Sequence, residues 1–237
     1  MAAQSKRYTN ASEHIDKEKA YDVSEAIELI KKTSTTKFDE TVEIHIRTSA
    51  DPRHADQQLR GIATLPHGLG KSVRVAVFVT GEAARAATEA GAEIVGADDL
   101  IEKVDGGFLD FDVAIATPDM MGKIGKLGRV LGRKGLMPNP RTNTVVQPHD
   151  IPGAVEEAKK GRVELRMDRT AIIHSPVGKA SFDNDKLRDN VASVVDTINQ
   201  LKPTAIKGQF VKTVFLTTTM GPSVQLDLGS TMAMKIE

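Results

Sequence analysis

The chain has 237 residues, with 32 basic side chains against 32 acidic ones, six histidines, no cysteine and no tryptophan. This length suits one large domain or two of ordinary size. The lack of cysteine excludes disulfide bonds, thiol catalysis and zinc sites built on thiolates, and it fits a reducing compartment. A net charge of zero argues at first sight against a nucleic-acid partner, because phosphate binding usually leaves a basic excess.

The neutral sum conceals two segregated blocks of charge. Residues 82–119 hold ten acidic side chains against Arg85 and Lys103, whereas residues 120–141 hold only basic ones. The basic block consists of Lys123, Lys126, Arg129, Arg133, Lys134 and Arg141. A block of this density favours a surface that faces phosphate, and a solvated face without a partner is the alternative.

Targeting signals are not evident. The first twenty residues have no apolar core of signal-peptide length and are too acidic for a typical transit peptide. No apolar run approaches the roughly 18–20 residues that a membrane span needs. We therefore expect a soluble, cytoplasmic protein with no membrane partner.

The two ends of the chain have an α+β pattern. A polar and mobile start is expected, and then a short amphipathic helix that Ser24 caps. Period-two alternation predicts a strand over 38–46, and an extended stretch follows over 59–65. Beyond Gly161 the expected elements are strands at 163–167, 171–174, 209–217 and 223–228, with a helix at 186–201.

The middle of the chain has a different texture. Strands are expected at 73–79, 93–95 and 113–116, and helices at 82–90, 98–104 and 151–160. Strands that alternate with helices predict a small parallel sheet covered on both faces. The predicted fold class is therefore α/β, with a discontinuous α+β domain of residues 1–67 and 161–237 and an inserted, Rossmann-like α/β domain of residues 68–160. The glycine-rich connections predict a hinge at His67, Gly68, Gly70 and Gly161.

Motifs for catalysis or cofactor binding are missing. Gly70-Lys71-Ser72 lacks the earlier glycine of a phosphate loop, because Leu65 stands in its place. The first strand of the insert is followed by Thr80-Gly81-Glu82 instead of a dinucleotide fingerprint. The histidines lack metal-ligand spacing, and no nucleophile elbow is present. We expect no enzyme activity, no metal and no cofactor.

Two local segments suit RNA, and each has a simpler interpretation. Residues 122–135 interleave glycines with cations, and Gly132-Arg133-Lys134-Gly135 mimics the GXXG clamp of KH domains. The alternative is a glycine loop that caps a helix. Residues 217–223 carry hydroxyls, a bare Gly221 and Met220, which could contact sugar and phosphate. The alternative is a threonine-rich strand end followed by a turn.

Several signatures, in order along the chain, resemble one family. They are Lys37-Phe38-Asp39-Glu40-Thr41-Val42-Glu43, Leu65-Pro66-His67-Gly68-Leu69-Gly70-Lys71, Ala116-Thr117-Pro118-Asp119, Leu127-Gly128-Arg129-Val130-Leu131-Gly132, Gly135-Leu136-Met137-Pro138-Asn139-Pro140, Val177-Gly178-Lys179 and Thr218-Thr219-Met220-Gly221-Pro222-Ser223. Together they resemble the bacterial form of ribosomal protein one of the large subunit, the family of the lateral stalk beside the tRNA exit site. The resemblance runs from about Lys6 to Leu228.

The resemblance implies where RNA would bind. In this family the domain made from both chain ends carries the main RNA-binding surface. The implied contacts are Lys37, Phe38, Thr41, Asp168, Arg169, Thr170, Thr218, Thr219, Met220, Gly221 and Ser223. Arg169 stands where the family commonly has lysine, which keeps the charge, and Thr213 stands where a relative has serine. The basic block of the insert is assigned to a second contact with RNA or tRNA.

The resemblance also implies a function. It points to a structural constituent of the large ribosomal subunit that binds stalk rRNA, helps to release exit-site tRNA and represses translation of its own mRNA. We expect the free protein to be a monomer. The alternative is an RNA-binding regulator or chaperone that stays outside the ribosome, and an enzyme that uses the α/β insert is a more distant one.

Overall fold

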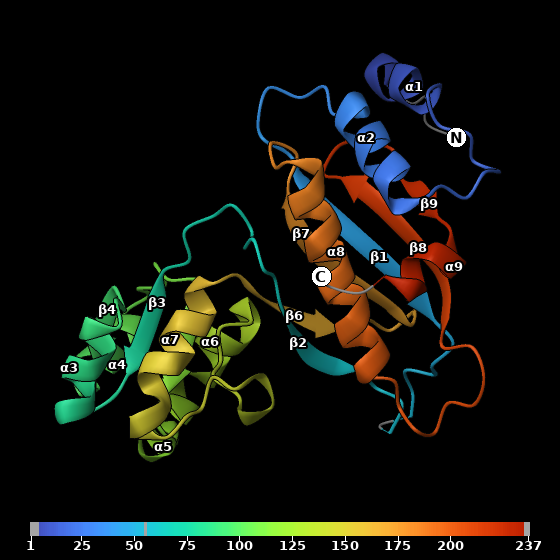
Figure 1. The fold of residues 1–237 in the computed structure, drawn as a ribbon. Helices are drawn as coiled ribbons and strands as arrows, with labels where there is room; N and C mark the ends of the chain where they lie inside the picture. Colours follow the sequence, from blue (N-terminus) through green and yellow to red (C-terminus); the bar gives the residue numbers. More distant parts are fainter. Residues whose placement is uncertain (1–4, 55, 235–237) are drawn as a thin grey trace. The chain divides into compact units, whose positions relative to one another are not determined.

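The computed structural model describes residues 5–54 and 56–234, and contacts between residues divide the chain into two compact units (Figure 1). Unit 1 comprises Met1–Gly70 and Val163–Glu237, and unit 2 comprises Lys71–Arg162. The first boundary between the two units follows Gly70, whereas the sequence predicted it after His67. Helices and strands are mixed in both units, and the predicted α/β class is confirmed.

Unit 1 is built on a four-stranded antiparallel sheet with the order β7-β1-β8-β9 (Figure 1). The strands are β1 (Thr41–Thr48), β7 (Ile172–Lys179), β8 (Val211–Thr218) and β9 (Val224–Leu226). A separate pair joins β2 (Arg60–Thr64) to β6 (Arg162–Arg166). The central strand β1 pairs with one strand from the C-terminal part on each side, so the two ends of the chain fold as one unit.

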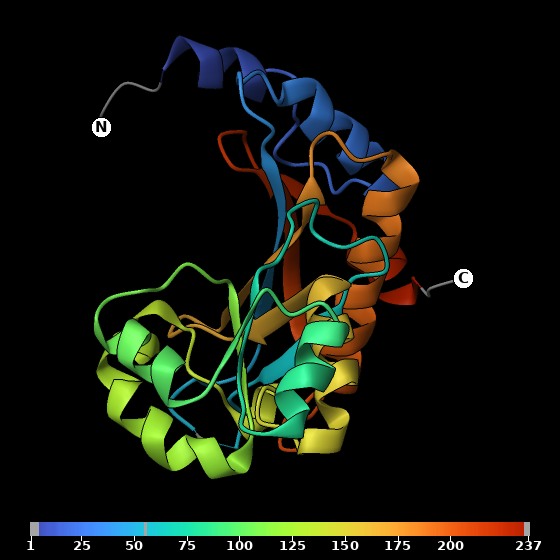
Figure 2. The ribbon, with the colours of Figure 1, turned by 90° about the vertical axis from the view of Figure 1, so that its left-hand side faces the viewer.

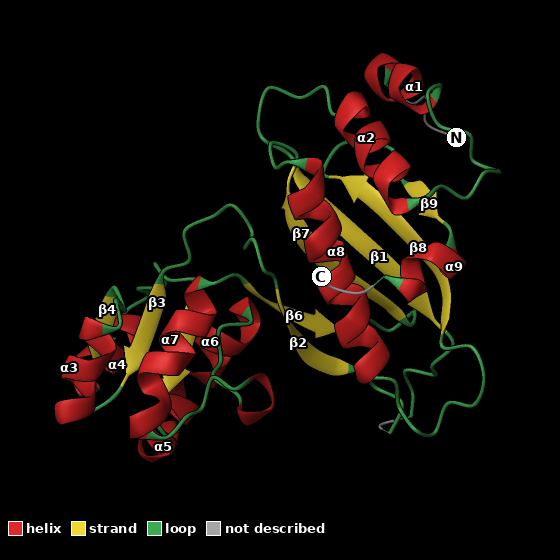
Figure 3. Cartoon of the chain, in the orientation of Figure 1, coloured by secondary structure: helices red, strands yellow, loops and turns green. Residues whose placement is uncertain are grey.

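The core of unit 1 lies between this sheet and its helices. Even-numbered residues of β1 are buried, and α2 (Val23–Thr33) and α8 (Asn184–Gln200) pack on their side of the sheet (Figure 3). Asp22 caps α2 by accepting a hydrogen bond from the Ser24 N–H, so the prediction of Ser24 as the cap was wrong by two residues. Within the start that the sequence predicts to be mobile, Lys6–Ser12 form helix α1, which Ser5 caps. A last helix, α9 (Leu228–Ala233), follows β9.

Unit 2 has a three-stranded parallel sheet with the order β4-β3-β5, and its helices lie on both sides of this sheet (Figure 2). The strands are β3 (Val75–Phe78), β4 (Ile94–Gly96) and β5 (Val113–Ala116). Two hydrophobic clusters cover opposite faces of β3. One holds Ala76 and Phe78 with α4 (Asp98–Asp105), α5 (Pro118–Ile124) and α6 (Gly128–Lys134), and the other holds Val75 and Val77 with α3 (Glu82–Glu89) and α7 (Ile151–Lys159). Because helices cover both faces of the sheet, β3 is buried on both sides, and this explains its run of β-branched residues.

The first connection between the units is tied to unit 1 at its start. The Asn190 amide of α8 accepts a hydrogen bond from the His67 N–H at 3.1 Å and donates to the Gly68 carbonyl at 3.0 Å. The His67 ring lies 3.0 Å from the Asp189 carboxylate. These contacts fix His67 and Gly68, so a hinge in this connection would have to turn beyond them. Gly70 and Gly161 both have positive φ, of 70° and 97°.

No helix among the described residues has the length and apolar character needed to cross a membrane.

Candidate nucleic-acid interface

A buried carboxylate organises one end of the unit 1 sheet. Glu40 is in phase with the buried Val42, Ile44 and Ile46 and is 1% exposed. Its Oε1 accepts hydrogen bonds from the Ser34 and Thr36 hydroxyls at 2.8 and 2.9 Å, and its Oε2 accepts one from the Met220 N–H at 2.9 Å. Burial alone would raise the pKa of Glu40, but these hydrogen bonds outweigh it and hold the pKa below its ordinary value.

The backbone around Thr219 is held from the other side by β1. The Thr219 N–H donates to the Thr41 carbonyl at 3.0 Å, and the Thr41 N–H donates to the Thr219 hydroxyl at 3.0 Å. The next turn closes tightly, since a Cβ on Gly221 would meet Thr218 Oγ1 at 2.4 Å. Lys179 Nζ also donates to the Thr41 hydroxyl at 2.9 Å. The segments around residues 36–41 and 218–222 therefore form one rigid structure.

This structure displays two large apolar side chains to solvent. Phe38 is 55% exposed and Met220 is 49% exposed, and they are two of only three large hydrophobic residues exposed among those that the structure describes. One exposed apolar side chain is ordinary on a protein surface, but two that are displayed from the same rigid structure suit an interaction site. We call the group the Phe38–Met220 surface; its members are Lys37, Phe38, Thr41, Thr219, Met220, Gly221 and Ser223.

Most of the contacts that the resemblance implied for this region come together here. Lys37 directly precedes Phe38 and is exposed, Ser223 follows Met220 by three residues and is exposed, and Thr41 is half-buried. Thr218 is different, because its side chain is only 2% exposed. Its hydroxyl lies beneath the turn and cannot reach a partner at the surface, so it is removed from the set of direct contacts. The sequence pattern of residues 217–223 does not show which hydroxyls are exposed and which are buried.

A second group of implied contacts forms a turn between β6 and β7. The Asp168 carboxylate accepts hydrogen bonds from the Thr170 N–H, the Thr170 hydroxyl and the Ile172 N–H at 2.6–2.8 Å. Burial opposes ionisation, but these donors and the His174 ring lower the pKa of Asp168 to about 2. Ala171 adopts a left-handed φ of 63°, and Arg169 is exposed. We call residues 168–171 the Asp168 turn.

The two groups lie at opposite ends of β1. Thr41 belongs to the Phe38–Met220 surface, whereas the hydroxyl of Thr48 at the other end donates a hydrogen bond to the Ala171 carbonyl of the Asp168 turn at 3.0 Å. Seven residues of extended strand separate these ends by roughly 23 Å. The sequence had listed both groups as one binding region, and the structure places a stretch of sheet between them.

That stretch carries a histidine pair. His45 on β1 and His174 on β7 are directly opposite each other, and their Nδ1 atoms lie 2.7 Å apart. Glu43 Oε2 lies 3.8 Å from His45 Nε2, and Asp168 Oδ2 lies 3.5 Å from His174 Nε2. Burial and the neighbouring His174 lower the pKa of His45, against the opposing effect of Glu43. At 2.7 Å one Nδ1 carries the proton and donates it to the other, which accepts the hydrogen bond.

The basic block of unit 2 divides into three parts. Lys123 forms an ion pair with Asp98 at 2.7 Å, and Lys126 is exposed. Arg129, Arg133 and Lys134 line a hollow of about 510 Å³ together with Leu109 and Val130. We call this the α6 hollow. The side chain of Arg141 lies outside the described part of the structure.

The clamp interpretation of Gly132–Gly135 is wrong. Residues 128–134 form helix α6, and Gly135 caps it in the left-handed conformation with φ 72°. A clamp that holds nucleotides needs an open loop between its glycines, and these residues are helical. The alternative of a helix-capping glycine is the correct one.

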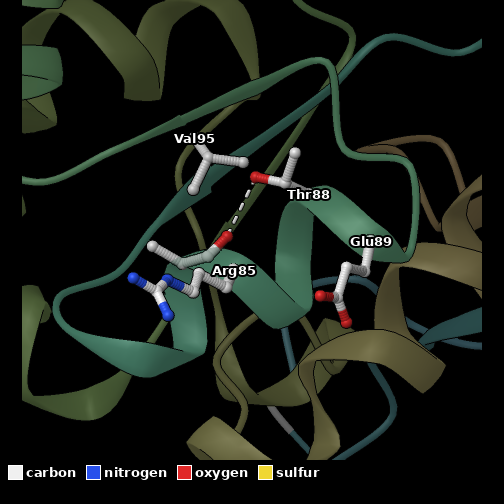
Figure 4. Close-up of a pocket in the computed structure, with 5 residues that line it drawn as sticks. Arg85, Thr88, Glu89 and Val95 are labelled. Carbon is white, nitrogen blue, oxygen red and sulfur yellow. Dashed lines mark hydrogen bonds between the residues drawn. The ribbon is translucent and has the colours of Figure 1, made fainter.

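A second hollow in unit 2 offers fewer groups that could bind a ligand. It lies between α3 and β4 and is lined by Ala84, Arg85, Thr88, Glu89 and Val95 (Figure 4). The Thr88 hydroxyl, which lines the hollow, already donates a hydrogen bond to the Ala84 carbonyl at 2.9 Å. Arg85 and Glu89 bring opposite charges to one helix, so this hollow favours no anionic partner.

Metal binding finds no support in the described residues. Among them, no group of three or more histidine and acidic side chains is arranged to hold a metal ion. The histidine pair is flanked by one carboxylate at each outer nitrogen, which leaves no common point for a cation.

Sequence reasoning missed three functional candidates. Glu40 supports the Phe38–Met220 surface, and the signal was available, because a carboxylate in phase with three buried aliphatic residues must itself be buried. Lys179 lies within the Val177-Gly178-Lys179 signature but was given no role. The His45–His174 pair could not be found, since the register of β1 against β7 depends on a β-bulge between Val42 and Glu43.

Taken together, the two units have the features of a nucleic-acid-binding protein. They display exposed apolar and hydroxyl side chains on a rigid frame in unit 1 and, in unit 2, cations that form no ion pair with any described residue and lie around two apolar side chains.

The chain belongs to the ribosomal protein L1p/L10e family, whose model matches residues 30–222. It is 56% identical over 234 residues to the large ribosomal subunit protein uL1 of Dehalococcoides mccartyi strain BAV1, with 99% of each chain covered. It is equally similar, at 56%, to the uL1 proteins of Thermosipho africanus over 228 residues and Fervidobacterium nodosum over 229 residues. In both cases 96% of this chain and 97% of the relative are covered. The resemblance read from the sequence is confirmed.

Proposed function

We propose that the protein is a structural constituent of the large ribosomal subunit, located with the ribosome in the cytoplasm, and that it binds stalk rRNA through unit 1. Family membership and the names of the relatives, all large ribosomal subunit proteins, support the ribosomal assignment. They also favour it over a regulator that works outside the ribosome.

One observation carries the RNA-binding part of the proposal. Phe38 and Met220 come from segments about 180 residues apart, and a single buried carboxylate holds both segments in place. Folded RNA is recognised by shape, through sugars, phosphates and unstacked bases. A rigid surface with apolar side chains, hydroxyls and few cations suits such a target better than a uniformly basic one.

The test is the affinity of two variants for a stalk-rRNA fragment. Met220→Asp and Phe38→Ala should each weaken binding about 10- to 100-fold, as expected for central residues of an interface. The matched control is Phe108→Ala, which removes an apolar side chain that is 39% exposed in unit 2. Unchanged affinity in both unit 1 variants would refute the proposal.

Release of exit-site tRNA and repression of the protein's own mRNA are further parts of the proposal. If the mRNA target has a similar fold to the stalk, both RNAs compete for the Phe38–Met220 surface. The stalk-rRNA fragment should then displace the mRNA leader in a competition assay, and Met220→Asp should weaken both complexes equally. Simultaneous binding of both RNAs to one protein would contradict this mechanism.

Association with the ribosome is tested separately. The protein should co-sediment with large ribosomal subunits, and Met220→Asp should shift it to the free fraction. Recovery only with other RNAs would favour the free-standing regulator.

A further inference from the structure

The α6 hollow combines an apolar floor with unpaired cations. Leu109 and Val130 are half-buried, and Arg129, Arg133 and Lys134 are exposed around them. Among the residues that the structure describes, none of these three cations forms an ion pair, in contrast to Lys123. Cations held near one another without acidic partners repel, so this arrangement favours an anionic occupant.

Helix geometry explains how one short helix supplies four of the five lining residues. Arg129 and Arg133 are four residues apart, as are Val130 and Lys134, so each pair lies one turn apart on adjoining faces. Leu131 points the other way and is fully buried with Leu127. The packing of Leu131 therefore fixes the face that is turned outward.

Two glycines of α6, Gly128 and Gly132, directly precede Arg129 and Arg133 in the sequence. A Cβ added at Gly128 or Gly132 would meet nothing within 4 Å, so the helix backbone is open to close approach beside Arg129 and Arg133. Apolar side chains and phosphate-binding groups thus occur together in the α6 hollow.

We propose that the α6 hollow is a binding site for one unpaired nucleotide of a single-stranded RNA segment. The phosphate contacts Arg129, Arg133 and Lys134, and the base and ribose lie on Leu109 and Val130. The inference rests on the proposed function in that the partner is RNA, and it names the part of the RNA that unit 2 contacts. A volume of about 510 Å³ is within the range of small-molecule sites and accommodates a nucleotide.

The chemistry separates this occupant from other anions. Inorganic phosphate would use the cations and leave the floor exposed to water. A base-paired segment would present phosphates but keep its bases stacked and out of reach. The proposal therefore requires both the phosphate and the unpaired base of the occupant, and the contribution of each can be tested in turn.

The first experiment compares RNA probes with the full chain at constant ionic strength. The probes are an eight-nucleotide unstructured RNA, the same strand without bases, and a duplex of the same length. Leu109 and Val130 methyl resonances should shift with the first probe only, and the first probe should bind about 10-fold more tightly than the strand without bases, the scale of one apolar base contact. Equal affinity for the two single strands would overturn the proposal.

The second experiment uses variants with a matched control. Arg133→Gln with Lys134→Gln should reduce the slope of log affinity against log salt by about 1.4, the value for two phosphate contacts on a single strand. Lys126→Gln with Lys123→Gln removes two charges of the same block outside the hollow and should leave the Leu109 and Val130 shifts intact. Val130→Ser keeps the charge and should remove the preference for the base-bearing strand. A retained preference would refute the base contact.

Failure of this inference is distinguishable from failure of the proposed function. The stalk-rRNA fragment is measured in parallel with Met220→Asp. If Met220→Asp abolishes stalk binding while the hollow variants leave the eight-nucleotide RNA unaffected, unit 1 binds rRNA and the α6 hollow does not hold a nucleotide.

Discussion

The two candidate interfaces use opposite chemistry. The Phe38–Met220 surface of unit 1 is apolar and rich in hydroxyls, and its one buried charge, Glu40, is satisfied internally and faces no partner. The α6 hollow of unit 2 presents three cations on a helix of seven residues. In the proposed function the first surface contributes fit and the second contributes charge, and a net charge of zero is compatible with this division.

The difference lies in how each interface is supported. In unit 1 the displayed side chains depend on hydrogen bonds between segments far apart in the sequence, so small changes beneath the surface should propagate to it. In unit 2 the cations project from one helix whose buried side, Leu131, fixes their direction. Variants beneath unit 1 should therefore cost more than variants on α6.

The largest effect is expected at Glu40. Glu40→Ala leaves the Ser34 and Thr36 hydroxyls and the Met220 N–H without an acceptor, which should lower the free energy of unfolding by about 3 kcal/mol. Affinity for stalk rRNA should fall more than 10-fold. Urea unfolding and filter binding measure the two effects. Glu40→Gln keeps one acceptor oxygen, so its stability and affinity should lie between those of the original chain and of Glu40→Ala. A stable Glu40→Ala protein with full affinity would show that the carboxylate does not hold the surface.

The salt dependence of binding should distinguish the two interfaces. Met220→Ala should weaken stalk-rRNA binding by about 1–3 kcal/mol while the slope of log affinity against log salt stays unchanged, because no phosphate contact is lost. Arg129→Gln should reduce that slope with a smaller loss of affinity at low salt. Titrations at four salt concentrations give both quantities. If Met220→Ala changed the slope and Arg129→Gln did not, the assignment of fit and charge would be reversed.

Local patterns in the sequence predicted much of the fold because they report directly on burial. The dense run at 73–79 and the alternation at 38–46 became β3 and β1, although β1 starts at Thr41. The regular ladder begins one residue after Glu40, although the Glu40 backbone carbonyl still accepts a hydrogen bond from the Ala180 N–H at 2.9 Å. Caps were harder, since Asp22 and Ser24 are both good N-cap residues and only the helix geometry chooses between them.

The candidate site was predictable only where it is local in sequence. Residues 217–223 could be singled out as unusual, but their attachment to Glu40 and Thr41 crosses about 180 residues and depends on the pairing of β1 with β8. The basic block was visible as composition, yet the division between a paired Lys123 and the lining residues of the α6 hollow follows from tertiary packing. Charge counts cannot show which cations have partners.

Two glycines should respond in opposite ways to the same substitution. Gly221→Ala places a Cβ 2.4 Å from Thr218 Oγ1, which is buried and cannot move aside, so stability should fall by about 1–3 kcal/mol. Gly132→Ala meets nothing within 4 Å inside α6 and should raise stability by about 0.5–1 kcal/mol. Thermal unfolding measures both. Equal effects at the two positions would show that the turn at Gly221 is not as tight as the structure has it.

The Asp168 turn should contribute stability that is lost in acid. The pKa of Asp168 is about 2, below its ordinary value of 3.8, so the contribution is fully present above pH 4 and is lost as the pH falls toward 2. Because the side chain is 36% exposed, solvent screening reduces the contribution to about 1 kcal/mol. Asp168→Asn should flatten the unfolding free energy between pH 4 and pH 2, and an unchanged slope would contradict the hydrogen bonds of the turn.

The histidine pair should give the smallest effect, with a different pH range. Burial and the neighbouring His174 lower the pKa of His45 below 6.5, so the unfolded chain takes up a proton more readily than the folded one. The free energy of unfolding should therefore decrease as the pH falls below 6.5, by less than about 1 kcal/mol because the His45 side chain is 26% exposed. His45→Gln should remove this decrease between pH 7.5 and 5.5 in urea titrations.

The same histidine reports on where RNA lies. His45 is on the sheet between the Phe38–Met220 surface and the Asp168 turn, so bound stalk rRNA should shift the titration of His45 toward higher pH if RNA covers this face. An unshifted titration would confine RNA to the two ends of β1.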